Sequence, residues 1–274
     1  MTTNERPYIT LSRLQHDLAQ LGIAPGDVVM LHVSVKAIGW IVGGPDVVLR
    51  ALLDVLTPSG TLMMYASWED NPDDLATGPP DRQQAYLAEC PPFDPATSRA
   101  ERGYSILTEY LRTWPGAQRS ANPSASMAAV GAQARWLTAD HPLQYGYGPG
   151  SPLAKLYQLG GKVLMLGAPL NTITLLHYAE NLAHVPDKRI TRYRLPLLQD
   201  GQRTWVDIEE FDTSDGIVDW PGQDYFEIIA EEFLAAGGGR TALVGAAQAY
   251  LFDAQPLVDV GVAWMERHFA QQPD

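Results

Sequence analysis

The sequence predicts an α/β fold, built as one core with a smaller subdomain near residues 190–220. Two apolar runs, 28–33 and 162–166, are rich in Val, Leu and Met, which is typical of strands buried on both faces. Segments with apolar residues at helical spacing lie between such runs, and the chain at 10–21 is an example. Alternation of strands and helices is the pattern of an α/β core.

The elements of the N-terminal half follow from this patterning. Thr10 is a suitable N-cap for the helix at 10–21, and Gly22 is a suitable C-cap. Pro45 can begin a helix that runs to residue 56, after a loop at 34–44 that contains three glycines. We also expect strands at 61–66 and 125–130, and helices at 83–87, 104–112, 131–137 and 151–159. The chain at 69–102 is polar and rich in proline, and loops of this length in compact domains are usually functional.

After the strand at 162–166, the sequence predicts a turn and a helix that contains His177. The segments 192–198 and 204–211 then alternate as antiparallel strands, joined by Asp200-Gly201, a hairpin signal. Helices are expected at 224–235 and 258–269, with further core structure at 242–252. We therefore treat residues 1–274 as a single domain with a subdomain near 190–220 and a long loop at 69–102.

Composition limits the partners of the chain. A formal net charge of -13 argues against nucleic acid, because phosphate binding requires a basic surface. The single cysteine, Cys90, cannot form an internal disulfide, and residues 1–7 are polar rather than signal-like. The longest apolar runs are too short to span a bilayer. We expect a cytoplasmic protein with no membrane partner.

Charge is distributed unevenly near the end of the chain. Residues 204–239 contain ten acidic residues and no Lys or Arg, whereas 188–194 carry four basic residues. A wall of one sign of charge can attract a polycationic ligand, although a solvated acidic surface explains the same residues.

His177 is the clearest candidate for catalysis. Its helix follows the carboxyl end of a strand, which is where ligands bind in open α/β sheets. Histidine is suited to proton transfer near neutral pH, and Glu180 lies on the same helix face. His177 and His184 flank Glu180 at metal-ligand spacing, which leaves a metal-assisted hydrolase as an alternative. A histidine that only packs its helix on the sheet is the other alternative.

Several segments, in register over roughly residues 10–270, resemble the aminoglycoside 3-N-acetyltransferases, the antibiotic N-acetyltransferase family. They include Leu31-His32-Val33-Ser34, Gly60-Thr61-Leu62, Pro92-Phe93-Asp94-Pro95 and Leu166-Gly167-Ala168-Pro169. The resemblance implies the α/β fold of this family, a central mixed sheet flanked by helices. It also implies acetyl transfer from acetyl-coenzyme A to the 3-amino group of the 2-deoxystreptamine ring of cationic aminoglycosides, which confers resistance, with no metal.

The resemblance and the residues together suggest direct transfer, with His177 as the general base. A carboxylate should orient its other ring nitrogen, and Glu180, Glu210 and Asp212 are the candidates. Thr174 or backbone N–H groups near the helix start are candidates for holding the thioester oxygen.

Further site residues are carried over from the resemblance. Those expected to bind coenzyme A are His32, Ser34, Lys36, Gly103, Tyr104, Arg119, Ser120 and Ser126. Those expected to contact the drug are Tyr65, Trp68, Glu69, Asp70, Glu210, Asp212 and Asp215. One departure is Asn122, where the family commonly has histidine, and asparagine cannot act as a base.

Alternatives of other classes stay open at this stage. An acetyltransferase of the same fold can act on another amine, and a binding module can sequester a cationic ligand without chemistry. The sequence leaves open the drug spectrum, the order of substrate binding, and whether the chain is a monomer or a homodimer.

Overall fold

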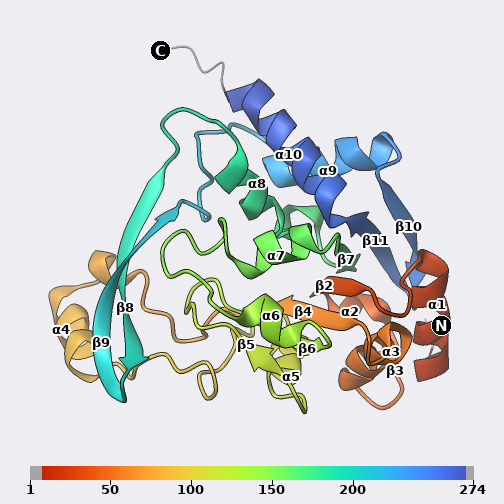
Figure 1. Cartoon of the computed structure of the whole chain (residues 1–274), viewed down its shortest axis with the longest axis horizontal. Helices are drawn as coiled ribbons and strands as arrows, with labels where there is room; N and C mark the ends of the chain where they lie inside the picture. The colour runs from red at the N-terminus through yellow and green to blue at the C-terminus, as the bar shows by residue number, and fades with distance from the viewer. Residues whose placement is uncertain (1–7, 270–274) are drawn as a thin grey trace, which may run out of the picture.

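The computed structural model describes residues 8–269, and its centre is a seven-stranded mixed sheet (Figure 1). The strand order is β10 (Gly239–Val244), β11 (Ala247–Asp253), β7 (Lys162–Leu166), β2 (Val28–Val33), β4 (Thr61–Tyr65), β6 (Met127–Gly131) and β5 (Gln118–Arg119). Strands β7, β2 and β4 are parallel to one another, and the remaining pairs are antiparallel. The structure confirms the predicted mixed sheet flanked by helices.

The register of β2 and β7 positions the site. Val33 pairs with Leu166 at the carboxyl ends of these two neighbouring parallel strands. The loops that follow them therefore begin side by side, and the backbone N–H of Ser34 donates to the carbonyl of Leu166. Ligands bind outside the carboxyl ends of strands in open α/β sheets, so this edge is the expected location of a functional site.

Helices cover both faces of the sheet in two apolar layers. Alternate strand residues point to opposite faces, so Val29 and Leu31 join one layer and Met30 joins the other. The first layer contains α1 (Leu11–Leu21), α3 (Asp46–Leu56) and α5 (Ile106–Arg112). The second contains α6 (Ala134–Thr138), α7 (Pro152–Gln158), α8 (Leu176–Leu182), α9 (Tyr225–Ala235) and α10 (Ala254–Phe269).

A long hairpin of β8 (Ile190–Gln199) and β9 (Gln202–Phe211) lies away from the main sheet, at the left of Figure 1. Its turn residues Asp200 and Gly201 both have positive φ, 50° and 76°, as the predicted Asp-Gly turn requires. The hairpin packs on the proline-rich segment: Phe93 bridges to Leu197 and shares a small apolar cluster with it. That segment contains η1 (Leu75–Thr77) and α4 (Pro80–Glu89). The division into a single domain with a subdomain stays a prediction.

Most predicted elements form within a few residues of their expected bounds, with three differences. The loop at 34–44 contains α2 (Val35–Ile38) and β3 (Trp40–Ile41), which pairs with β1 (Tyr8–Ile9). The short helix expected at 83–87 begins earlier, because Pro80 occupies its first position. Residues 242–252 form a hairpin, and the turn between β10 and β11 places Gly245 at φ 63°.

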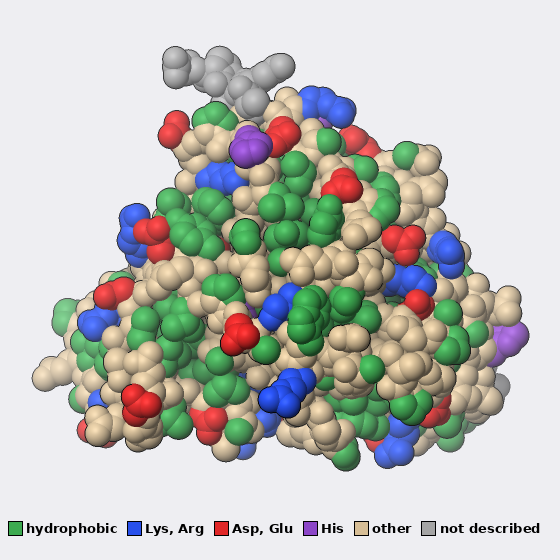
Figure 2. Space-filling model, viewed as in Figure 1, with side chains coloured by type: hydrophobic (Ala, Val, Ile, Leu, Met, Phe, Trp, Pro, Cys, Tyr) green, Lys and Arg blue, Asp and Glu red, His purple; other side chains and the backbone are tan. Residues whose placement is uncertain are grey.

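Figure 2 shows acidic and basic side chains interspersed among hydrophobic ones on one face of the molecule. Among residues 8–269, no helix is long and apolar enough to cross a membrane. The polar segment 1–7 used to argue against a signal peptide lies outside the described residues.

Candidate active site

His177 occupies the first turn of α8, as the sequence predicts. Its backbone N–H donates to the carbonyl of Thr174, 3.1 Å away, so the helix start is tied to the loop after β7. The side chain is 18% exposed, which leaves the imidazole partly open to solvent. The His177 ring lies between two other aromatic rings, Tyr147 at 5.0 Å and Phe226 at 4.8 Å between centroids. These contacts hold the imidazole in one orientation.

A hydrogen-bonded chain continues from the imidazole into the core. Nδ1–H of His177 donates to Oε2 of Glu180, with 2.6 Å between the heavy atoms. Glu180 is 1% exposed, and the hydroxyl of Tyr225 donates to its other oxygen, Oε1. The Tyr225 oxygen accepts in turn from the backbone N–H of Ile217. With Nδ1 committed to Glu180, Nε2 is the nitrogen left for a ligand.

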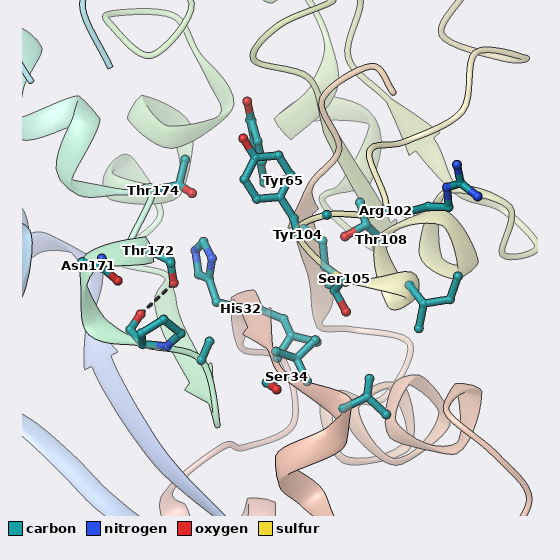
Figure 3. A pocket seen from close by; sticks show the side chains of 18 of the residues that line it. His32, Ser34, Tyr65, Arg102, Tyr104, Ser105, Thr108, Asn171, Thr172 and Thr174 are labelled. Carbon is teal, nitrogen blue, oxygen red and sulfur yellow. Dashed lines mark hydrogen bonds between the residues drawn. The ribbon is translucent and has the colours of Figure 1, made fainter. Parts of the chain in front are cut away.

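A large cavity at this edge has a volume of about 940 Å³ and is lined by His177. One part of its wall follows β2 and contains Ser34 and Lys36, and another contains Arg102 and Tyr104. Figure 3 shows Ser34 at one end of this cavity and Tyr65 toward the other. The cavity wall therefore contains the cationic residues Lys36 and Arg102 as well as the aromatic residues Tyr65, Tyr104 and Tyr147.

A second cavity, of about 300 Å³, lies on the Glu180 side of His177. Asp215 and Asp224 line it, whereas none of its lining residues is Lys or Arg. The two cavities share His177, Asn171, Thr213 and Ser214. His177 thus stands where a large cavity with cationic side chains meets a smaller acidic one.

Known proteins share this fold over its whole length. Residues 30–266 match the family model described as aminoglycoside 3-N-acetyltransferase. Aminoglycoside N(3)-acetyltransferase III of Pseudomonas aeruginosa is 56% identical, and the match covers 98% of this chain and 97% of the relative. The chain belongs to the aminoglycoside 3-N-acetyltransferase family.

Solved structures of the family superimpose closely on this chain. AAC-IIIb in a binary complex with CoASH has 50% identity and a TM-score of 0.90, covering 98% of this chain and 100% of that one. AAC-VIa bound to sisomicin has 39% identity and a TM-score of 0.90, with coverage of 96% and 100%. These matches confirm the family, the fold and the acyltransferase class that the sequence predicts.

The structure brings together five of the eight residues that family resemblance assigned to coenzyme A. His32, Ser34, Lys36, Gly103 and Tyr104 all line the large cavity.

The other three form hydrogen bonds within the protein. Arg119 donates to Ser126 Oγ and to the carbonyls of Ser98 and Ala66, and its guanidinium lies 4.9 Å from the centre of the Phe93 ring. Ser120 is fully buried and hydrogen-bonds to His141. None of Arg119, Ser120 and Ser126 lines the large cavity, and their assignment to cofactor binding stays a prediction.

Of the residues expected to contact the drug, some line one of the two cavities and others do not. Tyr65 lines the large cavity and Asp215 lines the small one. Trp68 is instead 2% exposed and packs in the cluster beneath the hairpin, so it offers no face to a sugar. Glu69 accepts two bonds from the Arg102 guanidinium and one from its backbone N–H. Asp70 is exposed and lines neither cavity.

Within residues 8–269, neither of the other two candidate carboxylates forms a hydrogen bond to His177. Asp212 Oδ1 accepts from the backbone N–H groups of Ser214 and Asp215, so it caps a turn. Glu210 accepts from the N–H groups of Gly146 and Phe211 and is 5% exposed. Its burial raises the pKa of Glu210 to about 7. The geometry therefore favours Glu180 over Glu210 and Asp212 as the partner of His177.

The arrangement required by the metal alternative is not formed. Helix α8 ends at Leu182, and Ala183 has extended backbone dihedrals, so His184 does not continue the face of His177. Among residues 8–269, no three His, Cys, Asp or Glu side chains form a group that could hold a metal ion.

Asn122 has a structural role. It is 3% exposed, its Oδ1 accepts from the N–H groups of Ser124 and Ala125, and its Nδ2 donates to the carbonyl of Pro142. All three bonds are within the loops behind Tyr147, and Asn122 does not line the cavity.

Two residues of the site lack a signal in the sequence. Tyr225 is 45 residues from Glu180, and Tyr147 lies in a glycine-rich loop. Only the packing of α9 and of that loop against α8 brings their side chains to the His177–Glu180 pair, which we call the dyad. The sequence predicted that α9 begins near Asp224, but it did not predict that Tyr225 contacts Glu180.

Proposed function

We propose that this chain transfers the acetyl group of acetyl-coenzyme A to the 3-amino group of the 2-deoxystreptamine ring of aminoglycosides. One observation carries the proposal: the His177–Glu180 pair stands at the junction of two cavities of different character. Membership of the family supports it, as do relatives described as bound to CoASH and to sisomicin.

The large cavity suits the acetyl donor. Lys36 and Arg102 line it and can face the phosphates, while apolar residues such as Val33 and Ile106 can line the path of the pantetheine arm. The volume of about 940 Å³ leaves room beside the arm for the reacting end of an acceptor. On this account, Ser34, Gly103 and Tyr104 form part of the wall around bound acetyl-coenzyme A.

The acidic side of His177 suits a polycationic acceptor. Asp215 and Asp224 give the smaller cavity a negative field, which raises the local concentration of ammonium groups. Tyr65 hydrogen-bonds to Tyr147 at 2.9 Å, and the Tyr147 ring lies 5.0 Å from the ring of His177. We propose that the reacting ring lies against this tyrosine pair.

The reaction is a direct transfer in which His177 acts as the general base. Nε2 takes a proton from the acceptor amine as its nitrogen forms a bond to the thioester carbonyl carbon, and the C=O electron pair moves to oxygen. The carbonyl then re-forms, the C–S bond breaks, and the thiolate receives the proton from His177. The products are the acetamide and free coenzyme A thiol.

Glu180 makes this proton transfer easier. Its carboxylate accepts from Nδ1–H, fixes the tautomer that leaves Nε2 bare, and stabilises the imidazolium that forms. Tyr225 occupies the other oxygen and prevents the carboxylate from rotating away. Thr174 lines the cavity beside His177 and is available to contact the thioester.

A thiol-release assay tests the proposal. Purified protein is mixed with acetyl-coenzyme A and with gentamicin, kanamycin, apramycin or no acceptor, and the acetylated nitrogen is identified by NMR. We expect release that depends on the drug and acetylation at the 3-amino group. Release with a different amine, but with none of these drugs, would move the assignment to another acceptor. Cytoplasmic location and oligomeric state stay predictions.

A further inference from the structure

A second histidine, His32, lines the large cavity at the carboxyl end of β2. Figure 3 shows its ring in the middle of the cavity. Thr172 and Thr174 lie on one side of the ring, and Tyr65 and Tyr104 lie on the other. His32 therefore lies between the threonines that follow β7 and the two tyrosines, within the cavity that His177 also lines.

The two ring nitrogens of His32 have different surroundings. Nε2 is enclosed and has no hydrogen-bond partner within residues 8–269. Nδ1 is not enclosed, and it too has no partner in the part of the chain the structure describes, so it is the nitrogen open to the cavity. An unpaired buried nitrogen costs about 1–3 kcal/mol as a donor or as an acceptor, so burial alone does not choose the tautomer. Only the tautomer with the proton on Nδ1 can donate a hydrogen bond into the cavity, and the proposal takes that one.

The ring is neutral under the conditions of the reaction. Burial, together with the nearby His177, lowers the pKa of His32 to about 4. A neutral imidazole offers one N–H and does not repel the imidazolium that forms on His177 during transfer. Neutral histidine is suited to polarising a carbonyl group in this way.

We propose that His32 is a second catalytic residue whose Nδ1–H donates a hydrogen bond to the thioester carbonyl oxygen. This rests on the acetyl transfer proposed above. When the amine nitrogen bonds to the carbonyl carbon, the C=O electron pair moves to the oxygen that His32 holds. The bond strengthens as negative charge develops and weakens again when the carbonyl re-forms and the C–S bond breaks. An unpartnered polar group in a cavity requires an explanation, and a ligand oxygen supplies it.

Two substitutions separate this role from packing and from proton transfer. His32→Asn keeps an N–H close to the Nδ1 position but cannot act as a base. His32→Leu has a similar volume and no donor. Replacing an unpaired buried nitrogen with an apolar atom is close to neutral for stability, so we expect the leucine variant to fold.

The experiment compares steady-state kinetics of wild type, both His32 variants and a His16→Leu control on the exposed face of α1. Removal of one oxyanion donor lowers kcat about 100-fold or more, which we expect for His32→Leu with KM for acetyl-coenzyme A within threefold. We expect His32→Asn to recover at least tenfold of that loss. A leucine variant with kcat within threefold of wild type would overturn the proposal, as would an asparagine variant no better than leucine.

A second measurement does not depend on the acceptor. The carbonyl stretching frequency of carbonyl-labelled acetyl-coenzyme A is measured while it is bound to each protein without a drug. We expect a lower frequency in wild type and His32→Asn than in His32→Leu, because a hydrogen bond weakens the C=O bond. Equal frequencies in all three would overturn the role of His32. An absence of transfer by wild type to any drug, with this shift present, would instead contradict only the proposed acceptor.

Discussion

Tyr225 donates its hydroxyl hydrogen to the oxygen of Glu180 that does not contact His177. Both carboxylate oxygens are therefore occupied, one by the imidazole and one by the phenol. Tyr225 begins α9 and Glu180 belongs to α8, so the packing of these two helices is what sets the direction of the dyad. The chain thus fixes the imidazole of His177 through a contact between two helices.

Tyr225→Phe tests this positioning role. Loss of the hydroxyl leaves Glu180 Oε1 and the N–H of Ile217 without their partner, so the carboxylate is free to turn. We expect kcat to fall about tenfold, which corresponds to about 1.4 kcal/mol, with KM values within threefold. Tyr157→Phe is the matched control, because its hydroxyl contacts Asp259 on α10 instead. Equal kinetics in the two variants would contradict a role for Tyr225 in the dyad.

Asn122→Ala separates stability from catalysis. The change leaves one buried and two part-buried backbone groups without a partner, and we expect the free energy of unfolding to fall by about 3 kcal/mol. Denaturant unfolding measures this loss, with exposed Gln118→Ala as the control. Because Asn122 does not line the cavity, kcat well below the melting temperature should stay within about threefold, on the same scale as a neutral change. A large loss of kcat in fully folded protein would indicate direct contact with a substrate.

Glu210 makes stability depend on pH. Burial raises its pKa from 4.5 to about 7, so the folded chain holds this proton at pH values where the unfolded chain has lost it. The contribution of Glu210 to the free energy of unfolding therefore falls as pH rises from about 4.5 to 7, by up to about 3 kcal/mol, and is constant above that range. Glu210→Gln removes this dependence, although it also weakens the bonds from Gly146 and Phe211.

The measurement is the difference in unfolding free energy between Glu210→Gln and wild type, at pH 5 and at pH 8. We expect the unfolding free energy of the variant, relative to that of wild type, to increase from pH 5 to pH 8, whatever the absolute stability of the variant. Glu231→Gln, on the exposed face of α9, should show a difference that does not change with pH. Parallel pH profiles for wild type and Glu210→Gln would contradict this account of the carboxyl.

Lys36 tests the assignment of the large cavity to the acetyl donor. Lys36→Met removes one cation from the wall and keeps the length of the side chain. We expect KM for acetyl-coenzyme A to rise about tenfold, in the range for a charge-assisted contact, and kcat to stay within twofold. Exposed Arg135→Met on α6 is the control. A rise in the drug KM alone would place the acceptor in this part of the cavity.

Local patterns in the sequence predicted the strands of the core, the hairpin turn at Asp200-Gly201 and the helix of His177. The His177–Glu180 pair could also be predicted, because Glu180 is three residues from His177 and shares its helix face. The contacts of Tyr225 and Tyr147 with this pair could not be predicted, because these residues reach the site only through tertiary packing. Family resemblance alone assigned Arg119, Ser120 and Trp68 to ligands; Ser120 and Trp68 are buried, and Arg119 hydrogen-bonds to the backbone, so none of the three side chains lines the large cavity.

The most direct test of the account is the activity of His177→Gln with acetyl-coenzyme A and an aminoglycoside accepted by wild type. Glutamine fills much of the same space but cannot take a proton from the amine. We expect kcat to fall about 1,000-fold, within the range for loss of a general base, with donor affinity and melting temperature close to wild type. A His177→Gln enzyme that is folded and retains more than a tenth of the wild-type kcat would contradict the central claim.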